Sequence, residues 1–186
     1  GNKITELDLS KNTALKTVYC YTNKLTKLTI GANSAINYIW CSDNPSLKNL
    51  DVSLCPNLTM LKFDMAAAKV KCINGDVPLD AVHFPDAAFR NYLYDKNGLN
   101  GLVRAVSIPS IKTIEVNGKS ISSLKGIEYF TALERLYCHN NKITELDLSK
   151  NTDLKTLNCS SNPLEYLNID TCSELIALEC RSTKLK

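Results

Sequence analysis

The fold is decided by Ile4-Thr5-Glu6-Leu7-Asp8-Leu9-Ser10-Lys11-Asn12-Thr13-Ala14-Leu15-Lys16-Thr17, because this stretch returns almost unchanged as residues 143–156. Elsewhere, apolar residues recur in the same phase at steps of 21 or 22 residues. Two such series are Leu7, Leu28, Leu50 and Leu136, Leu157, Leu178. A weaker copy places Ile114 22 positions before Leu136, so we expect the second series to begin near residue 111. The chain is therefore an array of one repeated unit.

Each repeat, or rung, carries a short strand pattern. In Thr17-Val18-Tyr19-Cys20-Tyr21, alternation turns Val18 and Cys20 inward and the other three residues outward. One rung has too few apolar residues to fold alone, so neighbouring rungs must stack as parallel strands. A period in the low twenties with this pattern is that of a leucine-rich repeat. The sequence therefore predicts a leucine-rich-repeat solenoid, a right-handed superhelix of short parallel strands.

Two other positions of the rung have predicted roles. An asparagine follows the strand, where its amide can bond the backbone of its own turn and of the neighbouring rung. A Leu-Asp-Leu-like piece forms the return side of the coil, and we expect a second short extended segment there. The asparagines are Asn23, Asn44, Asn141 and Asn162, and the return pieces begin at Leu7, Leu28, Leu50, Leu146 and Leu167.

Residues 76–110 interrupt the repeat. Phe84 to Leu93 predicts a cap helix of about three turns, with Pro85 in its first turn, Asp86 at its positive end and Asn97-Gly98 after it. Its apolar face is Phe84, Ala88, Phe89, Tyr92 and Leu93. We expect block 1 at residues 1–75 with about three rungs, a linker and helical cap at 76–110, and block 2 at 111–186 with about three to four rungs.

The chain has eight cysteines, and their phase favours buried free thiols over disulfides. Cys20, Cys41, Cys138, Cys159 and Cys180 share one inward strand position. Cys55 and Cys172 share another, which we take to be the position of Thr13 and Thr152. Residues that repeat in phase are expected to be core residues.

Composition and motifs argue against several classes of function. A net charge of +3 without a Lys/Arg run gives no nucleic-acid signature, and no apolar stretch is long enough to span a membrane. The sequence contains no Cys-x-x-Cys zinc motif, and Cys138 and His139 face opposite ways as strand neighbours, so they cannot form a catalytic pair. We expect no enzyme, no metal and no cofactor.

Leu136-Tyr137-Cys138-His139-Asn140-Asn141-Lys142-Ile143-Thr144-Glu145-Leu146-Asp147-Leu148-Ser149-Lys150-Asn151 resembles the cysteine-ladder repeats of internalin J-like proteins and of Bacteroidetes surface proteins. Phe84 to Leu93 and Ile121 to Glu128 resemble their amino-terminal cap. The resemblance implies a bacterial, exported, surface-attached protein. Gly1-Asn2-Lys3 reads as a cut end, so extracellular or cell-surface localisation rests on the resemblance. Asp95 to Gly101 has Leu99 where a calcium loop needs a carboxylate, which favours a helix-ending turn.

Outward strand residues on the concave face are the candidate binding site, because their side chains do not pack in the hydrophobic core. Tyr19 and Trp40 fall side by side and are the expected anchors; exposed aromatic clusters suit protein contacts or sugar stacking. Alternatively, these rings only cover one another or pack against the cap helix. The candidate residues are Tyr19, Tyr21, Tyr38, Trp40, Lys62, Arg135, Tyr137, His139 and Arg181.

The mixture of aromatic and charged residues favours a module that binds a protein partner, on the host or on a bacterial surface, over a carbohydrate-binding module. A carbohydrate-binding module would align its aromatic rings flat along a groove. A third alternative is a passive spacer segment within a longer surface protein.

Overall fold

The computed structural model describes residues 2–64, 68–72, 76–96, 101–103 and 108–185. The chain forms two compact units. The first contains residues 1–83 and 94–104, and the second contains residues 84–93 and 105–186. The segment 76–110, expected as linker and cap, is thus divided between the two units.

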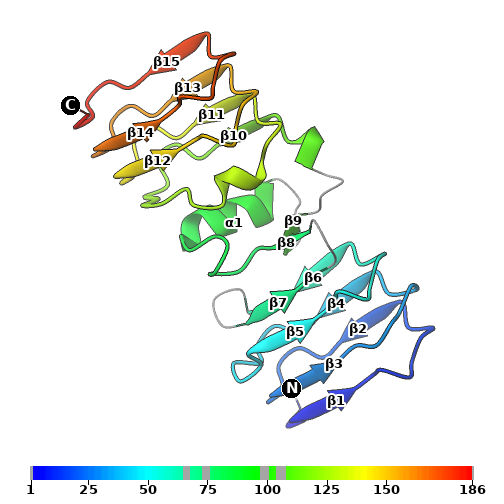
Figure 1. Cartoon of the computed structure of the whole chain (residues 1–186). Helices are drawn as coiled ribbons and strands as arrows, with labels where there is room; N and C mark the ends of the chain where they lie inside the picture. The colour runs from blue at the N-terminus through cyan, green and yellow to red at the C-terminus, as the bar shows by residue number, and fades with distance from the viewer. Residues whose placement is uncertain (1, 65–67, 73–75, 97–100, 104–107, 186) are drawn as a thin grey trace. The chain divides into compact units, whose positions relative to one another are not determined.

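In the first unit, each rung contributes one strand to each of two walls (Figure 1). One wall is the parallel sheet β2-β4-β6, with Val18, Ile39 and Leu61 in register. The other contains the parallel pairs β1-β3 and β5-β7, in which Leu7 lies opposite Leu28, and Leu50 opposite Val70. The bounds are β1 Glu6–Asp8, β2 Thr17–Tyr19, β3 Lys27–Thr29, β4 Tyr38–Trp40, β5 Asn49–Asp51, β6 Met60–Lys62 and β7 Lys69–Lys71; β8 Val77–Pro78 and β9 Leu102–Val103 form a short antiparallel pair.

The second unit repeats this plan. Its larger parallel sheet has the order β10-β11-β13-β15, and β12 pairs with β14 on the return side (Figure 1). Ile114 lies opposite Leu136, which confirms the weaker repeat copy. The bounds are β10 Thr113–Glu115, β11 Arg135–Tyr137, β12 Glu145–Asp147, β13 Thr156–Asn158, β14 Tyr166–Asn168 and β15 Ala177–Glu179, with 3-10 turns η1 Ile108–Ser110 and η2 Ile127–Tyr129. The predicted solenoid of short parallel strands is confirmed.

The asparagines bond as predicted. Asn162 is 2% exposed, and its Nδ2 donates to the carbonyls of Cys159 and Ser160 in its own turn and of Cys138 in the neighbouring rung. Its Oδ1 accepts from the backbone N–H of Ile143. Asn44 and Asn141 make the same kind of contacts with their own and neighbouring turns. One side chain per rung therefore satisfies backbone groups that the turn leaves unpaired inside the coil.

The thiols are free, and four of the five in the inward strand position are buried: Cys20, Cys41, Cys138 and Cys159. The expectation was wrong for Cys180, which is half-buried, because β15 is the outermost strand of its sheet in this chain and no rung covers it.

The position assigned to the other two cysteines was also wrong. The N–H of Cys55 donates to the carbonyl of Val52, and that of Cys172 to Ile169. In the earlier rungs the same turn bond is made by Asn12 and Asn151, so the cysteines occupy the asparagine position and not that of Thr13 and Thr152.

The cap helix α1 comprises Ala87–Lys96 and starts later than predicted. Oδ1 of Asp86 accepts the N–H of Phe89 at 3.0 Å, so Asp86 is the N-cap and Pro85 precedes the helix instead of standing in its first turn. Phe84, also before the helix, is fully buried, as are Phe89 and Leu93. The expected stop at Asn97-Gly98 lies outside the described residues, as do Asn100 and Leu99 of the calcium-like run.

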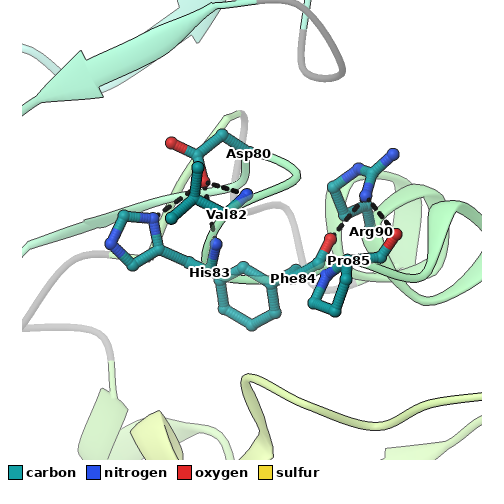
Figure 2. Close-up of polar contacts among 6 residues, drawn as sticks. All are labelled: Asp80, Val82, His83, Phe84, Pro85 and Arg90. Atoms are coloured by element: carbon teal, nitrogen blue, oxygen red, sulfur yellow. Dashed lines mark hydrogen bonds and ion pairs between the residues drawn. The ribbon is translucent and has the colours of Figure 1, made fainter.

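Two charged residues near this point of the sequence, Asp80 and Arg90, are buried (Figure 2). In the first unit, Asp80 is 1% exposed, and its Oδ1 accepts the N–H groups of Val82 and His83 and lies 2.7 Å from Nδ1 of His83. In the second unit, Arg90 donates to the carbonyls of Phe84 and Pro85. Each charge thus satisfies the backbone of its own turn.

Candidate functional site

The ladder face of the first unit consists of the outward side chains of β2, β4 and β6 and of the residue two positions after each strand. Strand alternation exposes them, because the intervening Val18, Ile39 and Leu61 enter the core. The members are Thr17, Tyr19, Tyr21, Tyr38, Trp40, Ser42, Met60, Lys62 and Asp64. Five of the predicted site residues therefore lie together on this face.

Trp40 is held from several sides. The ring of Tyr21 stacks on it at 4.5 Å between centroids and 27° between planes, and Nζ of Lys62 lies 4.5 Å from its centroid. These two side chains come from rungs before and after Trp40, so they cover its two faces. Nε1 of Trp40 donates to Oγ of Ser42 at 2.6 Å. The indole is only partly exposed, so it is better placed to support its neighbours than to stack on a ligand.

The tyrosines are the more accessible part of the face. Tyr19 is 60% and Tyr21 42% exposed. Tyr19 lies beside Trp40 as predicted, with 6.2 Å between centroids, and packs against Tyr38 at 5.2 Å. These rings come from neighbouring strands, so the aromatic contacts run from rung to rung across the face.

Sequence reasoning placed Ser42 on this face without a specific role and did not name Tyr94, a residue of α1. Burial raises the pKa of Tyr94, and the nearby Tyr38 and Asp95 raise it further, which places Tyr94 close to Tyr38. Tyr38 is half-buried. The interpretation that the rings cover one another therefore fits Trp40 and Tyr38, whereas it fits Tyr19 poorly. Strand alternation predicted the place of Ser42, and the alternative of packing against the cap helix includes Tyr94, which lies in α1.

The remaining predicted residues lie on the corresponding face of the second unit, which has fewer aromatic rings. Arg135 is exposed, and its Nε donates to Oγ1 of Thr113 at 3.0 Å. Tyr137 and His139 are half-buried, and Nδ1 of His139 is buried without a partner among the described residues. Arg181 follows the outermost strand and is exposed.

Other surface features lie away from both faces. One groove of about 530 Å³ includes Leu54, Lys69 and Lys71 over β5 and β7, and another of about 530 Å³ includes Glu145 and Tyr166 over β12 and β14. Tyr166 is 52% exposed, and the sequence analysis did not single it out. None of the predicted site residues lines these grooves.

No group of three or more His, Cys, Asp or Glu side chains within the described ranges is placed to hold a metal ion. Burial raises the pKa of Cys20 and Cys159 to about 11, and raises that of Cys41 and Cys138 further, so these thiols stay protonated at neutral pH. In the same part of the chain, no helix is long and apolar enough to cross a bilayer.

Comparisons with known proteins agree with this architecture. The family model described as Leucine Rich repeats (2 copies) matches residues 131–179. The crystal structure of internalin C2 from Listeria monocytogenes is 27% identical with a TM-score of 0.53, and the match covers 59% of this chain and 50% of internalin C2. A search of curated proteins found no significant match.

Two further Listeria monocytogenes structures are similar. An internalin (inlF) is 27% identical with a TM-score of 0.49, covering 59% of this chain and 34% of the internalin. The functional domain of InlJ, described as including a cysteine ladder, is 32% identical with a TM-score of 0.39, covering 98% of this chain and 33% of that domain. The chain thus spans a third to a half of the three proteins' lengths. The predicted leucine-rich-repeat character is confirmed by the family model, and the structure of internalin C2 supports the resemblance to internalins.

Proposed function

We propose, from the premise that this chain is a leucine-rich-repeat protein similar to the internalins, that it is a non-catalytic bacterial cell-surface or extracellular protein that binds protein partners. The binding, in adhesion or host contact, would use the ladder face of the first unit; Arg135, Tyr137, His139 and Arg181 form a separate candidate surface on the second unit. Leucine-rich-repeat folds serve many partners, so the proposal rests on the face itself.

The observation that carries the proposal is the aromatic cluster on the ladder face, whose side chains do not pack in the hydrophobic core. Tyr19 remains 60% exposed even though it packs against two other rings. Large rings of this kind, kept in solvent and held by neighbours, are typical anchors of protein interfaces. We assign the anchor role to Tyr19 and Tyr21, and a supporting role to Trp40.

The same geometry weighs against carbohydrate binding. A sugar ring stacks on an open aromatic face, but Tyr21 and Lys62 cover the faces of Trp40. The face also mixes aromatic rings with a lysine and several hydroxyls, a composition that suits a polypeptide surface better than a flat sugar.

The experiment is a binding screen of the purified chain against an array that holds host extracellular proteins and glycans together. Tyr19→Ala is compared with Tyr166→Ala, which removes a tyrosine of similar exposure from the return side. We expect one or more protein spots to lose signal tens of fold with Tyr19→Ala alone, since an anchor ring contributes about 2 kcal/mol or more. Binding only to glycans, or equal loss with both variants, would contradict the proposal.

A further inference from the structure

Two thiols that follow neighbouring strands of the second unit lie opposite one another. In the parallel pair β13-β15, Asn158 lies opposite Glu179, and the N–H of Cys159 donates to the carbonyl of Glu179 at 2.8 Å. The register therefore continues by one residue and places Cys159 opposite Cys180. Sγ of Cys159 donates to the same carbonyl at 3.6 Å, so this thiol is directed toward the next rung. The backbones of neighbouring strands are about 4.8 Å apart, and the two side chains leave them on the same side.

Access to solvent distinguishes this pair from other in-register cysteine pairs of the described residues. Cys159 is 1% exposed, whereas Cys180 is half-buried. Burial and then the nearby Cys180 raise the pKa of Cys159 to about 11, which agrees with two neighbouring sulfur atoms. Both thiols are buried in the pairs Cys20 with Cys41 and Cys138 with Cys159. A small solute can therefore reach the pair of Cys159 and Cys180 from the side of Cys180.

The separation of the two thiols matches the coordination of a soft cation that takes two ligands in a line. Soft thiolate ligands select Cu(I) among the biological metal ions. With metal–thiolate bonds of about 2.3 Å, as zinc forms, the two sulfurs of a linear unit lie about 4.6 Å apart, close to the strand spacing. Such a site needs only two ligands, so it requires neither a Cys-x-x-Cys motif nor a group of three side chains.

We propose that Cys159 and Cys180 bind one Cu(I) ion between two rungs of the second unit. Each thiol gives up its proton to solvent as its sulfur bonds the ion, so one Cu(I) ion and two thiols form a bis-thiolate complex with a single negative charge. The ion keeps its oxidation state, and the only bonds that break in the protein are the two S–H bonds. Because Cys180 is half-buried, water can solvate this charge in part, whereas a fully buried pair would leave it unsolvated.

The first unit supplies a matched control. Cys72 is half-buried like Cys180, but Val52 lies opposite it, because the register of β5 and β7 continues through the bond from the N–H of Val52 to the carbonyl of Lys71. Cys72→Ser should therefore leave Cu(I) binding unchanged. Cys180→Ser should weaken it about a hundredfold or more, since loss of an outer-shell partner alone costs about 10–100-fold. Val52→Cys should create a second pair and raise the stoichiometry from one copper per chain to two.

The measurement is competition for Cu(I) with the coloured chelator bicinchoninate, without oxygen and with ascorbate as the reductant, at pH 6.5 and pH 7.5. Because two protons leave, the apparent affinity should rise about a hundredfold over this pH unit, against about tenfold for a single thiol. X-ray absorption of the loaded chain should show two sulfur neighbours around the copper. Circular dichroism checks that each variant folds.

Four outcomes would overturn the proposal. They are a tenfold pH dependence in the wild-type chain, full binding by Cys180→Ser, equal weakening by Cys180→Ser and Cys72→Ser, and no second copper in folded Val52→Cys. If Cys180→Ser does not fold, the pH dependence of the wild-type chain and the stoichiometry of Val52→Cys still decide the question.

Discussion

At the scale of single residues, each buried asparagine bonds several backbone groups with one side-chain amide. We predict that Asn162→Ala lowers the unfolding free energy by about 3 kcal/mol, because it removes the described partner of the Cys159 carbonyl and of the Ile143 N–H and one of the two bonds to the Cys138 and Ser160 carbonyls. Asn49→Ala, at an exposed strand position whose side chain makes no hydrogen bond with the other described residues, should change it by less than about 0.5 kcal/mol. Urea unfolding of both variants measures the difference. Similar losses would show that the Asn162 bonds contribute little.

The thiols differ in reactivity because they differ in burial. We predict that iodoacetamide at pH 8 modifies the half-buried Cys180 and Cys72 first, while Cys20, Cys41 and Cys138 react only after denaturation. The reacting species is the thiolate, and the raised pKa of the buried thiols keeps its population small. Mass spectrometry over a time course gives the order of labelling. Rapid labelling of Cys138 in the native chain would contradict the prediction.

At the scale of elements, the turn before η2 packs closely against Phe84, next to the cap helix. Gly126 has φ +102°, and a Cβ there would lie 2.1 Å from a ring atom of Phe84. Phe84 is fully buried and cannot move away without opening a gap. We predict that Gly126→Ala lowers the unfolding free energy by about 2–5 kcal/mol, from backbone strain and overpacking together.

Gly118 is the matched control. It has φ +65°, but a Cβ there meets nothing within 4 Å. Gly118→Ala should therefore cost only the backbone strain, about 1 kcal/mol. Thermal unfolding of the two variants under the same conditions separates the contributions, and an equal loss would mean that contact with Phe84 is unimportant.

The N-cap of α1 also ties the helix to the repeats. Oδ2 of Asp86 accepts the backbone N–H of Ser122 at 2.8 Å and its hydroxyl at 2.9 Å. Burial raises the pKa of Asp86, but the bonds from Ser122 and Phe89 outweigh burial and leave this pKa below its usual value. Asp86→Asn should therefore reduce stability by about 1 kcal/mol at pH 7, and the difference from wild type should shrink as pH falls below about 4. Urea unfolding at pH 7 and pH 3 tests this, and a difference that persists at pH 3 would contradict it.

At the scale of the whole molecule, both units contain buried thiols whose raised pKa makes the folded chain less stable at alkaline pH. The pKa of Cys20 and Cys159 is about 11 in the folded chain, against about 8.5 for an exposed cysteine. Between these values the unfolded chain has lost protons that the folded chain keeps. The unfolding free energy must then fall as pH rises from about 8.5 to 11, while below about 8.5 the thiols contribute no slope.

We predict that each such thiol contributes up to about 1.4 kcal/mol per pH unit within this window. Cys159→Ala should flatten the slope of unfolding free energy between pH 9 and 10.5 while lowering stability at pH 7 by about 1–2 kcal/mol through the cavity it leaves. Urea unfolding under reducing conditions at several pH values gives both quantities. An unchanged alkaline slope in Cys159→Ala would contradict the prediction.

By itself, the sequence determined the core of the inner rungs, the parallel register and the role of the asparagines, but not the burial of Leu178 and Cys180 at the outermost strand. Each rung contacts mainly its neighbours, so a residue's environment repeats with the period and can be read from it. The division into 1–75, 76–110 and 111–186 remains a prediction.

Only the tertiary structure decided the features that depend on how particular side chains meet. Trp40 and Tyr19 have the same alternation signal, yet Tyr21, Lys62 and Ser42 cover Trp40 and leave Tyr19 open. Phase did not predict the anchoring of α1 either, because the N-cap residue Asp86 also accepts two bonds from Ser122, 36 residues away. Periodicity records which way a side chain points, whereas its packing depends on the conformations of its neighbours in space.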